Sequence, residues 1–190
     1  MPQPPALIII DMQQGMQFNT LPPRNNPGAE DTMARLHAAW RLAGYPIVSV
    51  RHISRSPESV FAPGQSGVEF QARFQPLDHE HVVEKNVPDA FVHSGLERWL
   101  HARGITDVVM VGVSTNNSVE ATARTAGNLG FATIVVSDAT FTFDKVDFGG
   151  TRRCAEDVHL MALANLHGEY AEVLSCDEVL RRYELTEDAR

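Results

Sequence analysis

The sequence has few of the features that mark membrane, secreted or disulfide-stabilised proteins. It contains two cysteines, Cys154 and Cys176, in 190 residues, too few for a disulfide framework. The longest apolar run, residues 6–10, is far shorter than the roughly 20 residues that a helix needs to cross a bilayer. No basic segment precedes this run, so we expect neither a secretory signal nor a membrane partner. We therefore expect the protein to be located in the cytoplasm.

Positive charge is also scarce. Lys and Arg total 16 against 24 Asp and Glu, which gives a net charge of −8. Because no excess of Lys and Arg is present to displace phosphate counterions, we expect no nucleic-acid partner. The apolar content of 43% is ordinary for a globular protein and excludes a disordered chain. We find no repeat, linker or low-complexity tract, and we therefore treat residues 1–190 as a single domain.

Six short runs rich in β-branched residues predict strands, and several are apolar at every position, as in strands buried on both faces of a parallel sheet. The runs are 6–11, 46–52, 81–85, 107–113, 132–138 and 171–175. Helical patterns that end at glycine lie between most of them: 29–44, 95–103, 118–129 and 151–167. The alternation predicts an α/β fold, a three-layer α/β/α sandwich around a mostly parallel six-stranded sheet with Rossmann-like topology.

Residues 53–80 interrupt this alternation. The stretch has no clear helical pattern and contains three prolines and two glycines. A long irregular connection inside a compact domain is usually functional or disordered. We expect a loop over the sheet edge that helps to cover a pocket.

Three reactive side chains fall where predicted strands end, which is where ligands bind in open parallel sheets. Asp11 ends the first run, Lys85 ends the third, and Ser118 follows the turn after the fourth. Taken singly, each is ordinarily a helix cap, a loop residue or a solvated side chain. Asn117 and Glu120 have the spacing of a capping box, which predicts Asn117 as the cap and Ser118 as the first helical residue. The helix dipole there would stabilise negative charge on a nucleophile or on an oxyanion beside it.

Taken together, these segments resemble a known family. The matching motifs are LIIIDMQ (7–13), VVEKNVPDAF (82–91), GVSTNNSVEATAR (112–124), LGF (129–131) and VVSDATFTF (135–143). With these motifs the chain resembles the isochorismatase-like hydrolases, often called cysteine hydrolases. The resemblance runs from about residue 5 to residue 180.

The resemblance implies a catalytic triad of Asp, Lys and Cys. Asp11 would act as general base, and Lys85 would hold the nucleophile and the developing charge. A non-proline cis peptide would join Val113 and Ser114, and the backbone N–H groups of Ser114 and Ser118 would form the oxyanion hole. The resemblance also implies a small-molecule substrate and a homo-oligomer, a dimer or larger.

Residue 118 departs from the family, because it is serine where the family has its cysteine. Neither Cys154, in the last predicted helix, nor Cys176, beyond the last predicted strand, can replace it. A hydroxyl is far less acidic than a thiol, whose reference pKa is ~8.5. Three interpretations stay open: an engineered replacement of the cysteine, a natural branch with Ser118 as nucleophile, and a branch that works without a nucleophile or not at all.

The leading hypothesis is hydrolysis of a C–N bond in a small amide or ureido-type compound through an acyl-enzyme on residue 118. The alternative is cleavage of a vinyl ether, which isochorismatases proper perform by protonation with the Asp and without the cysteine. For the dicarboxylate that such a reaction implies, only Arg51, Arg55 and Arg73 lie nearby in the sequence. The third possibility is a catalytically silent binding protein.

Four further side chains are candidates for contacts with the substrate. Phe18 and Phe143 follow strands and could wall an apolar pocket. Gln13 could form hydrogen bonds with the substrate, and His52 ends the second strand. His52 has no acidic residue two positions before it, and one imidazole does not make a zinc site. We therefore predict no metal and no other cofactor.

Overall fold

The first strand lies at the centre of the molecule. In the computed structural model, which describes residues 3–186, every residue of β1 (Ala6–Ile10) has an exposed fraction of 2% or less. A strand of five apolar residues is stable in this position because both of its faces are covered. Its neighbours, β2 (Ile47–His52) and β4 (Asp107–Val113), pair with it in parallel on either side.

The sheet has six strands, all parallel, in the order β3-β2-β1-β4-β5-β8. The remaining strands are β3 (His81–Lys85), β5 (Ala132–Phe141) and β8 (Glu172–Leu174). From β1 the chain builds outward to β3, then returns to the other side of β1 to form β4. The strand order therefore reverses between β1 and β4, and a crevice opens at their carboxyl ends.

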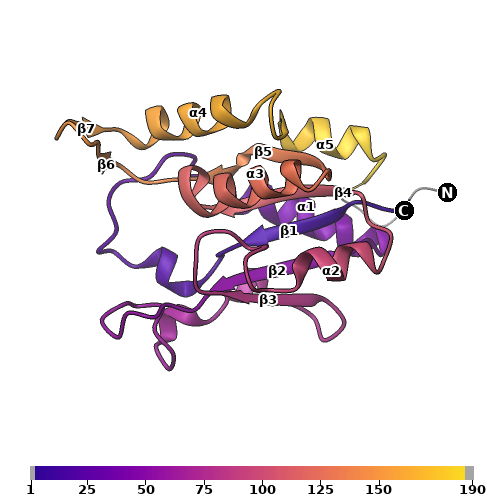
Figure 1. Ribbon diagram of the computed structural model, residues 1–190, viewed down its shortest axis with the longest axis horizontal. Helices are drawn as coiled ribbons and strands as arrows, with labels where there is room; N and C mark the ends of the chain where they lie inside the picture. The colour runs from indigo at the N-terminus through magenta and orange to yellow at the C-terminus, as the bar shows by residue number, and fades with distance from the viewer. Residues whose placement is uncertain (1–2, 187–190) are drawn as a thin grey trace.

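Helices cover both faces of the sheet (Figure 1). α1 (Ala29–Ala43) and α5 (Cys176–Arg182) pack on one face, over a core that includes the fully buried Trp40. α2 (Leu96–His101), α3 (Glu120–Asn128) and α4 (Ala155–Leu166) share the core of the opposite face. The predicted α/β/α sandwich is confirmed. In the part of the chain that the structure describes, no helix combines the length and the apolar character needed to cross a membrane.

Long connections gather at one end of the sheet, where the strands finish (Figure 1). The segment after β1 contains a 3₁₀ turn at Gln14–Gln17, and residues 53–80 contain two more, at Ser66–Val68 and Ala72–Phe74. The loop packs tightly on itself: a Cβ on Gly67 would lie 2.2 Å from the carbonyl oxygen of Val60. The expected irregular loop is therefore largely ordered by short turns and close backbone contacts.

Candidate active site

Asp11 lies where β1 ends, at the reversal of strand order. Its φ of 55° places it in the left-handed region, which few residues other than glycine adopt, and its N–H donates to Val50 at 2.9 Å. Across the crevice, Gly112 of β4 has a φ of 121°, and a Cβ there would lie 2.1 Å from the Ile10 carbonyl oxygen. The observed close approach of the two strands therefore requires glycine at position 112. Strained backbone of this kind concentrates at functional sites.

The structure brings the three predicted catalytic side chains together. Lys85 Nζ lies 2.7 Å from Asp11 Oδ2 and 3.3 Å from Ser118 Oγ. Asp11, Lys85 and Ser118 are 2%, 3% and 6% exposed. The buried lysine contacts both the carboxylate and the hydroxyl and so joins the three side chains in one cluster; their catalytic roles stay a prediction.

Burial sets the electrostatics of the site. Loss of solvation raises the pKa of Asp11 above its usual value, while the Lys85 ammonium and, to a smaller extent, the Ser118 hydroxyl lower it. Asp11 Oδ1 is buried and has no hydrogen-bond partner among the residues described. Such an acceptor normally finds a donor, because leaving it unpaired costs about 1–3 kcal/mol. The site therefore has one free acceptor beside a hydroxyl.

Ser118 lies on a single turn of π-helix, Thr115–Val119, which we call the elbow. The predicted capping box is wrong: the N–H groups of Asn117 and Val119 both donate to the Ser114 carbonyl, at 3.0 and 3.2 Å. Backbone bonds, and not the Asn117 side chain, therefore start the helix. The Glu120 carboxylate pairs with Arg124 at 2.7 Å instead of returning to a cap. Ser118 is the fourth residue of the elbow, just ahead of α3.

Hydrogen bonds hold the elbow on two sides. On one side, Thr122 Oγ1 donates to the Ser118 carbonyl at 2.7 Å and accepts the N–H of Ala90 at 3.0 Å. On the other, Thr115 Oγ1 lies 2.9 Å from Nδ1 of His159, which is buried in α4. The elbow is thus tied both to the connection after β3 and to α4.

The bond that precedes the elbow, Val113–Ser114, is a cis peptide, as the resemblance implies. The role of the Ser114 and Ser118 N–H groups as an oxyanion hole stays a prediction.

The side chain of Gln13 is hydrogen-bonded within the protein, and its predicted contact with a substrate stays a prediction. Its side chain is fully buried, its Nε2 donates to the carbonyls of His52 and Val68 at 3.0 and 2.9 Å, and its Oε1 accepts the His52 N–H at 2.8 Å. Both amide hydrogens and the carbonyl are therefore used inside the protein. Gln13 therefore holds β2 and the 53–80 loop in place, with both of its amide hydrogens used inside the protein.

His52 remains a candidate for contact with the substrate. It is paired in register with Lys85 at the carboxyl ends of β2 and β3, and its ring meets Phe61 edge-on with centroids 6.3 Å apart. Partial burial, together with the charge of Lys85, lowers the pKa of His52 and favours the neutral imidazole.

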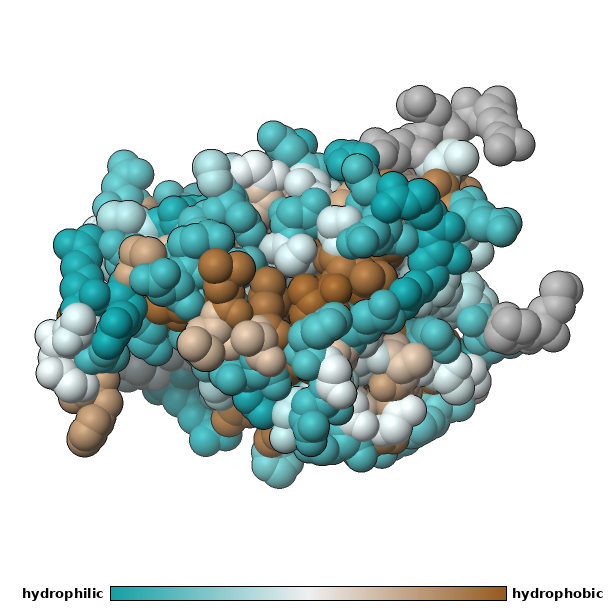
Figure 2. Space-filling model, turned by 90° about the horizontal axis from the view of Figure 1, so that it is seen from above, coloured by the Kyte–Doolittle hydropathy of each residue, from teal (hydrophilic) through white to brown (hydrophobic). Residues whose placement is uncertain are grey.

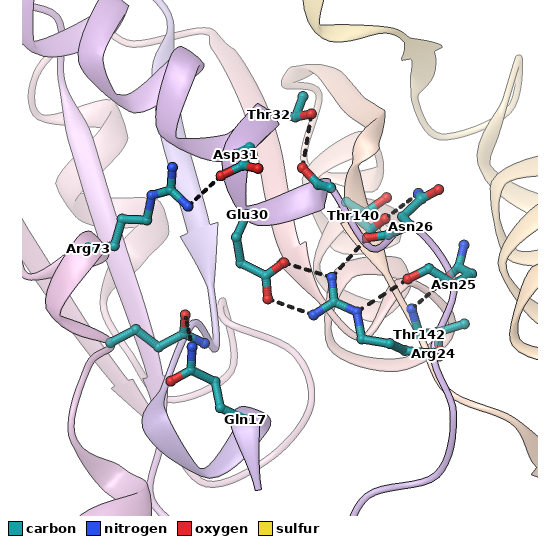
Figure 3. Close-up of polar contacts among 12 residues, drawn as sticks. Gln17, Arg24, Asn25, Asn26, Glu30, Asp31, Thr32, Arg73, Thr140 and Thr142 are labelled. Carbon is teal, nitrogen blue, oxygen red and sulfur yellow. Dashed lines mark hydrogen bonds and ion pairs between the residues drawn. The ribbon is translucent and has the colours of Figure 1, made fainter. Parts of the chain in front are cut away.

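The two predicted aromatic contacts lie in or beside the connection between β1 and α1, which a polar network fixes (Figure 3). Arg24 pairs with both oxygens of Glu30 at 2.6 and 2.7 Å, and its guanidinium lies 3.5 Å from the centre of the Phe141 ring. Phe143 forms an isolated antiparallel β-bridge with Arg24, and its ring packs edge-on against the ring of Phe141. Phe143 thus belongs largely to the core on the α1 face, while Phe18 is half-buried in the connection itself. Their contact with a substrate stays a prediction.

A surface pocket of about 650 Å³ borders Lys85. Ten residues line it: Ile53, Ser54, Arg55, Ser56, Pro57, Ala62, Pro63, Glu84, Lys85 and Asn86. The sequence analysis missed Asn86, whose Oδ1 accepts from Arg55 at 2.9 Å. Its position directly after a strand-ending lysine was the available signal. The 53–80 loop therefore borders a pocket, as expected of it.

Within residues 3–186, His, Cys, Asp and Glu side chains form no group of three that could hold a metal ion. The expectation of a site without metal or cofactor stays a prediction.

The fold is an α/β fold with a parallel sheet, and Asp11, Lys85 and Ser118 come together near the reversal of its strand order. These two features define the class: an α/β protein with an enzyme-like site. A family model described as the isochorismatase domain matches residues 5–178. The uncharacterized isochorismatase family protein YrdC of Bacillus subtilis is 35% identical, over 94% of this chain and 95% of its own. The streptothricin hydrolase of Streptomyces noursei is 33% identical, over 73% of this chain and 50% of its own.

A crystal structure of an isochorismatase-family protein from Chromobacterium violaceum superposes with a TM-score of 0.92 and 46% identity, covering 95% of this chain and 94% of that one. The chain therefore belongs to the isochorismatase family of hydrolases.

Proposed function

We propose that this protein hydrolyses a C–N bond of a small amide or ureido-type compound, with Ser118 as nucleophile. The observation that carries the proposal is the placement of Lys85 Nζ between Asp11 Oδ2, at 2.7 Å, and Ser118 Oγ, at 3.3 Å. The surface pocket of about 650 Å³ that borders Lys85 is lined by neither Asp11 nor Ser118, so the proposal rests on the three side chains and not on this pocket. The streptothricin hydrolase relative supports hydrolysis as the reaction class and leaves the substrate of this chain open.

In the first half of the reaction, the ionised Asp11 accepts the hydroxyl proton of Ser118 as Oγ attacks the carbonyl carbon. The C–O bond forms, and the carbonyl π electrons move to oxygen, where the N–H groups of Ser114 and Ser118 hold the oxyanion. Collapse of this intermediate breaks the C–N bond, and Asp11 returns its proton to the leaving nitrogen. Ammonia or an amine departs, and the acyl group remains on Ser118.

In the second half, water gives its proton to Asp11 and attacks the acyl carbon, and the acid product leaves as Ser118 recovers its proton. Asp11 acts twice as base, so it must be ionised despite its burial. Lys85 makes this possible because its positive charge, 2.7 Å away, opposes the effect of burial on the pKa of Asp11. The unpartnered Oδ1 gives Asp11 a free acceptor for the proton.

A second candidate function, cleavage of a vinyl ether, follows from the same carboxyl group. Burial raises the pKa of Asp11, and a protonated carboxyl could donate a proton to an enol ether carbon without any nucleophile. This reaction needs Asp11 but not Ser118, so the two functions make opposite predictions for position 118.

The test is ammonia release from a panel of small amides and ureido compounds by the unmodified protein, Ser118→Cys and Ser118→Ala. We expect turnover by the serine form, faster turnover by Ser118→Cys, since a thiol ionises more readily, and none by Ser118→Ala. Thr122→Ser, which keeps the hydroxyl that braces the elbow, is the matched control and should retain activity.

Turnover by Ser118→Cys alone would overturn serine as the nucleophile and identify a silenced thiol-hydrolase site. Vinyl ether cleavage that is unaffected by Ser118→Ala would support the second candidate. Binding of panel compounds without turnover in any form would instead indicate a silent binding protein.

A further inference from the structure

A buried histidine lies on the inner side of α4, next to the elbow. The outer side of this helix lies at the surface, where Leu160 and Met161 are 55% and 64% exposed. Figure 2, which views the molecule from the side of α4 and α5, shows hydrophobic side chains gathered between hydrophilic ones on that surface. His159, by contrast, is 3% exposed. Burial of a polar ring is costly unless its nitrogens have partners, so the partners of His159 matter.

The His159 ring joins the elbow to the sheet. Nδ1 lies 2.9 Å from Oγ1 of Thr115, the first residue of the elbow, which is fully buried. The backbone of Ser137, in β5, is a second hydrogen-bond partner of the ring. Burial lowers the pKa of His159 and favours the neutral imidazole, which has one N–H and one acceptor nitrogen. Because the N–H is donated to the backbone of Ser137, Nδ1 accepts the hydroxyl proton of Thr115.

A longer series of hydrogen bonds ties the next residue of the elbow to the same helix. Asn116 Oδ1 accepts the hydroxyl of Thr142 at 2.5 Å, and the Thr142 N–H donates to Asn25 Oδ1 at 2.8 Å. Asn25 Nδ2 donates in turn to Glu156 of α4 at 3.1 Å. Asn25 and Thr142 appear in the network of Figure 3. The direct contact with α4 is therefore the one that His159 makes.

The position of the elbow decides whether Ser118 contacts Lys85. Lys85 Nζ lies 3.3 Å from Ser118 Oγ, just beyond the ~2.7–3.2 Å that is usual for an N–H···O bond, so a small further displacement would break the contact. A misplacement of about 1 Å at a reacting group can lower a rate by about 100-fold. A single turn of π-helix is also a rare form of backbone. The side chains that hold this turn therefore matter for its geometry.

We propose that His159 is a positioning residue: by accepting the Thr115 hydroxyl, it holds the elbow where Ser118 Oγ contacts Lys85. This role in catalysis rests on the proposed function, since it requires residue 118 to attack the substrate. His159 acts through the elbow, because its hydrogen-bond partners are Thr115 and the backbone of Ser137.

A thiol at position 118 tests the proposal without any need for turnover. In Ser118→Cys, alkylation by iodoacetamide is followed across pH, and mass spectrometry separates the modified peptide from those of Cys154 and Cys176. The Lys85 ammonium favours the thiolate, as a neighbouring cation does. His159→Leu, added to Ser118→Cys, removes the acceptor that holds the elbow. We expect the midpoint of the alkylation profile to rise by about one pH unit or more, since the thiolate loses its contact with the ammonium.

Two conservative variants separate positioning from packing. His159→Asn places an amide oxygen close to the position of Nδ1, so it should restore the midpoint found with His159. His159→Gln reaches instead towards the backbone of Ser137 and should shift the midpoint as His159→Leu does. His37→Leu is the matched control, since His37 is also a 3% exposed histidine but lies in α1, on the other face of the sheet, and it should leave the midpoint unchanged.

A change on the elbow itself keeps the test decisive if His159→Leu fails to fold, which circular dichroism shows. Thr115→Val removes the same hydrogen bond from the other side and should shift the midpoint in the same direction. Thr115→Ser keeps the hydroxyl and should restore it. When both His159→Leu and Thr115→Val fold, their combination should shift the midpoint no further than either alone, because the two changes remove one contact.

Ammonia release by the serine form is measured in parallel. We expect His159→Leu to lower kcat by about tenfold or more and to change KM by less than about twofold. An unchanged alkylation midpoint in His159→Leu, or equal shifts in His159→Leu and His159→Asn, would overturn the proposal. Absence of ammonia release from both the unmodified protein and Ser118→Cys would contradict the proposed function instead, and the alkylation midpoints would still decide whether His159 positions residue 118.

Discussion

Gln13 pairs with the end of β2 through its side chain, accepting the backbone N–H of His52 at 2.8 Å and donating to its carbonyl at 3.0 Å. The amide thereby takes the place that a neighbouring strand would fill. Its second hydrogen reaches the Val68 carbonyl at 2.9 Å, so one side chain joins the strand end to the 53–80 loop.

Replacement of Gln13 by leucine should destabilise the protein by about 3 kcal/mol, because three backbone groups would lose their partner in a largely buried place. The free energy of unfolding in urea measures this effect, and limited proteolysis should show faster cleavage within 53–68. Gln14→Leu is the matched control, since the Gln14 side chain is half-buried and has no hydrogen bond in the structure. Equal stabilities of the two variants would contradict the role of Gln13.

Loss of Asp11 alone should cost more stability than loss of both members of the buried Asp11–Lys85 pair. Asp11→Leu leaves the Lys85 ammonium, whose side chain is 0% exposed, without its partner and should cost about 3–5 kcal/mol. The double variant Asp11→Leu with Lys85→Met removes both charges and should recover most of that stability while remaining inactive. Urea unfolding and ammonia release measure the two properties separately. A double variant no more stable than the single one would show that the ion pair is not the source of the loss.

The pH dependence of the reaction reports the state of Asp11. Burial raises the pKa of Asp11 above 3.8, and a base must be ionised, so kcat/KM should rise with pH through that raised pKa. Lys85→Met removes the cation that lowers the pKa, so its residual activity should rise only at still higher pH. Glu97→Gln, at an exposed position of α2, is the control and should leave the profile unchanged. Activity that falls with pH through this range would mean that Asp11 acts as an acid.

His37 should make the fold sensitive to acid. It is buried in α1, its Nε2 has no hydrogen-bond partner among the residues that the structure describes, and burial together with Arg41 lowers its pKa from 6.5 to about 4. Between these pH values the unfolded chain binds a proton that the folded chain does not, so stability is lost as pH falls through this range.

His37→Leu should therefore reduce the stability difference between about pH 7.5 and about pH 5 by about 2 kcal/mol. Urea midpoints at the two pH values measure it. His93→Leu, at an exposed histidine, is the control. Its stability difference between the two pH values should equal that of the unmodified protein. An unchanged difference in His37→Leu would show that another group carries the acid sensitivity.

The sequence was sufficient for the sheet because its strands are continuous apolar runs, such as residues 6–10, whose burial follows from composition alone. The sequence also predicted Asp11, Lys85 and Ser118 at strand ends, and the folded chain brings their side chains together. The elbow was misread because its π-turn depends on backbone bonds to the Ser114 carbonyl, which leave no side-chain signature.

The hydrogen bonds of Gln13 within the protein could not be predicted for a different reason. Its partners His52 and Val68 are 39 and 55 residues away in sequence, so nothing local distinguishes it from a glutamine that faces the pocket. The hairpin of β6 (Lys145–Val146) and β7 (Arg152–Arg153) has strands of two residues each, too short for any periodic pattern to predict. Contacts between distant segments, and not composition, decide both cases.

Residues 53–80 border the pocket beside Lys85 but supply none of the three side chains in the cluster of Asp11, Lys85 and Ser118. Asp11 directly follows β1, Lys85 ends β3 and Ser118 lies on the elbow, so all three lie outside the loop. In the proposed function, the side chains that react and the loop that borders the pocket therefore come from separate segments of the chain. We expect substitutions within residues 53–80 to change which compounds are bound and to leave the cluster of Asp11, Lys85 and Ser118 in place.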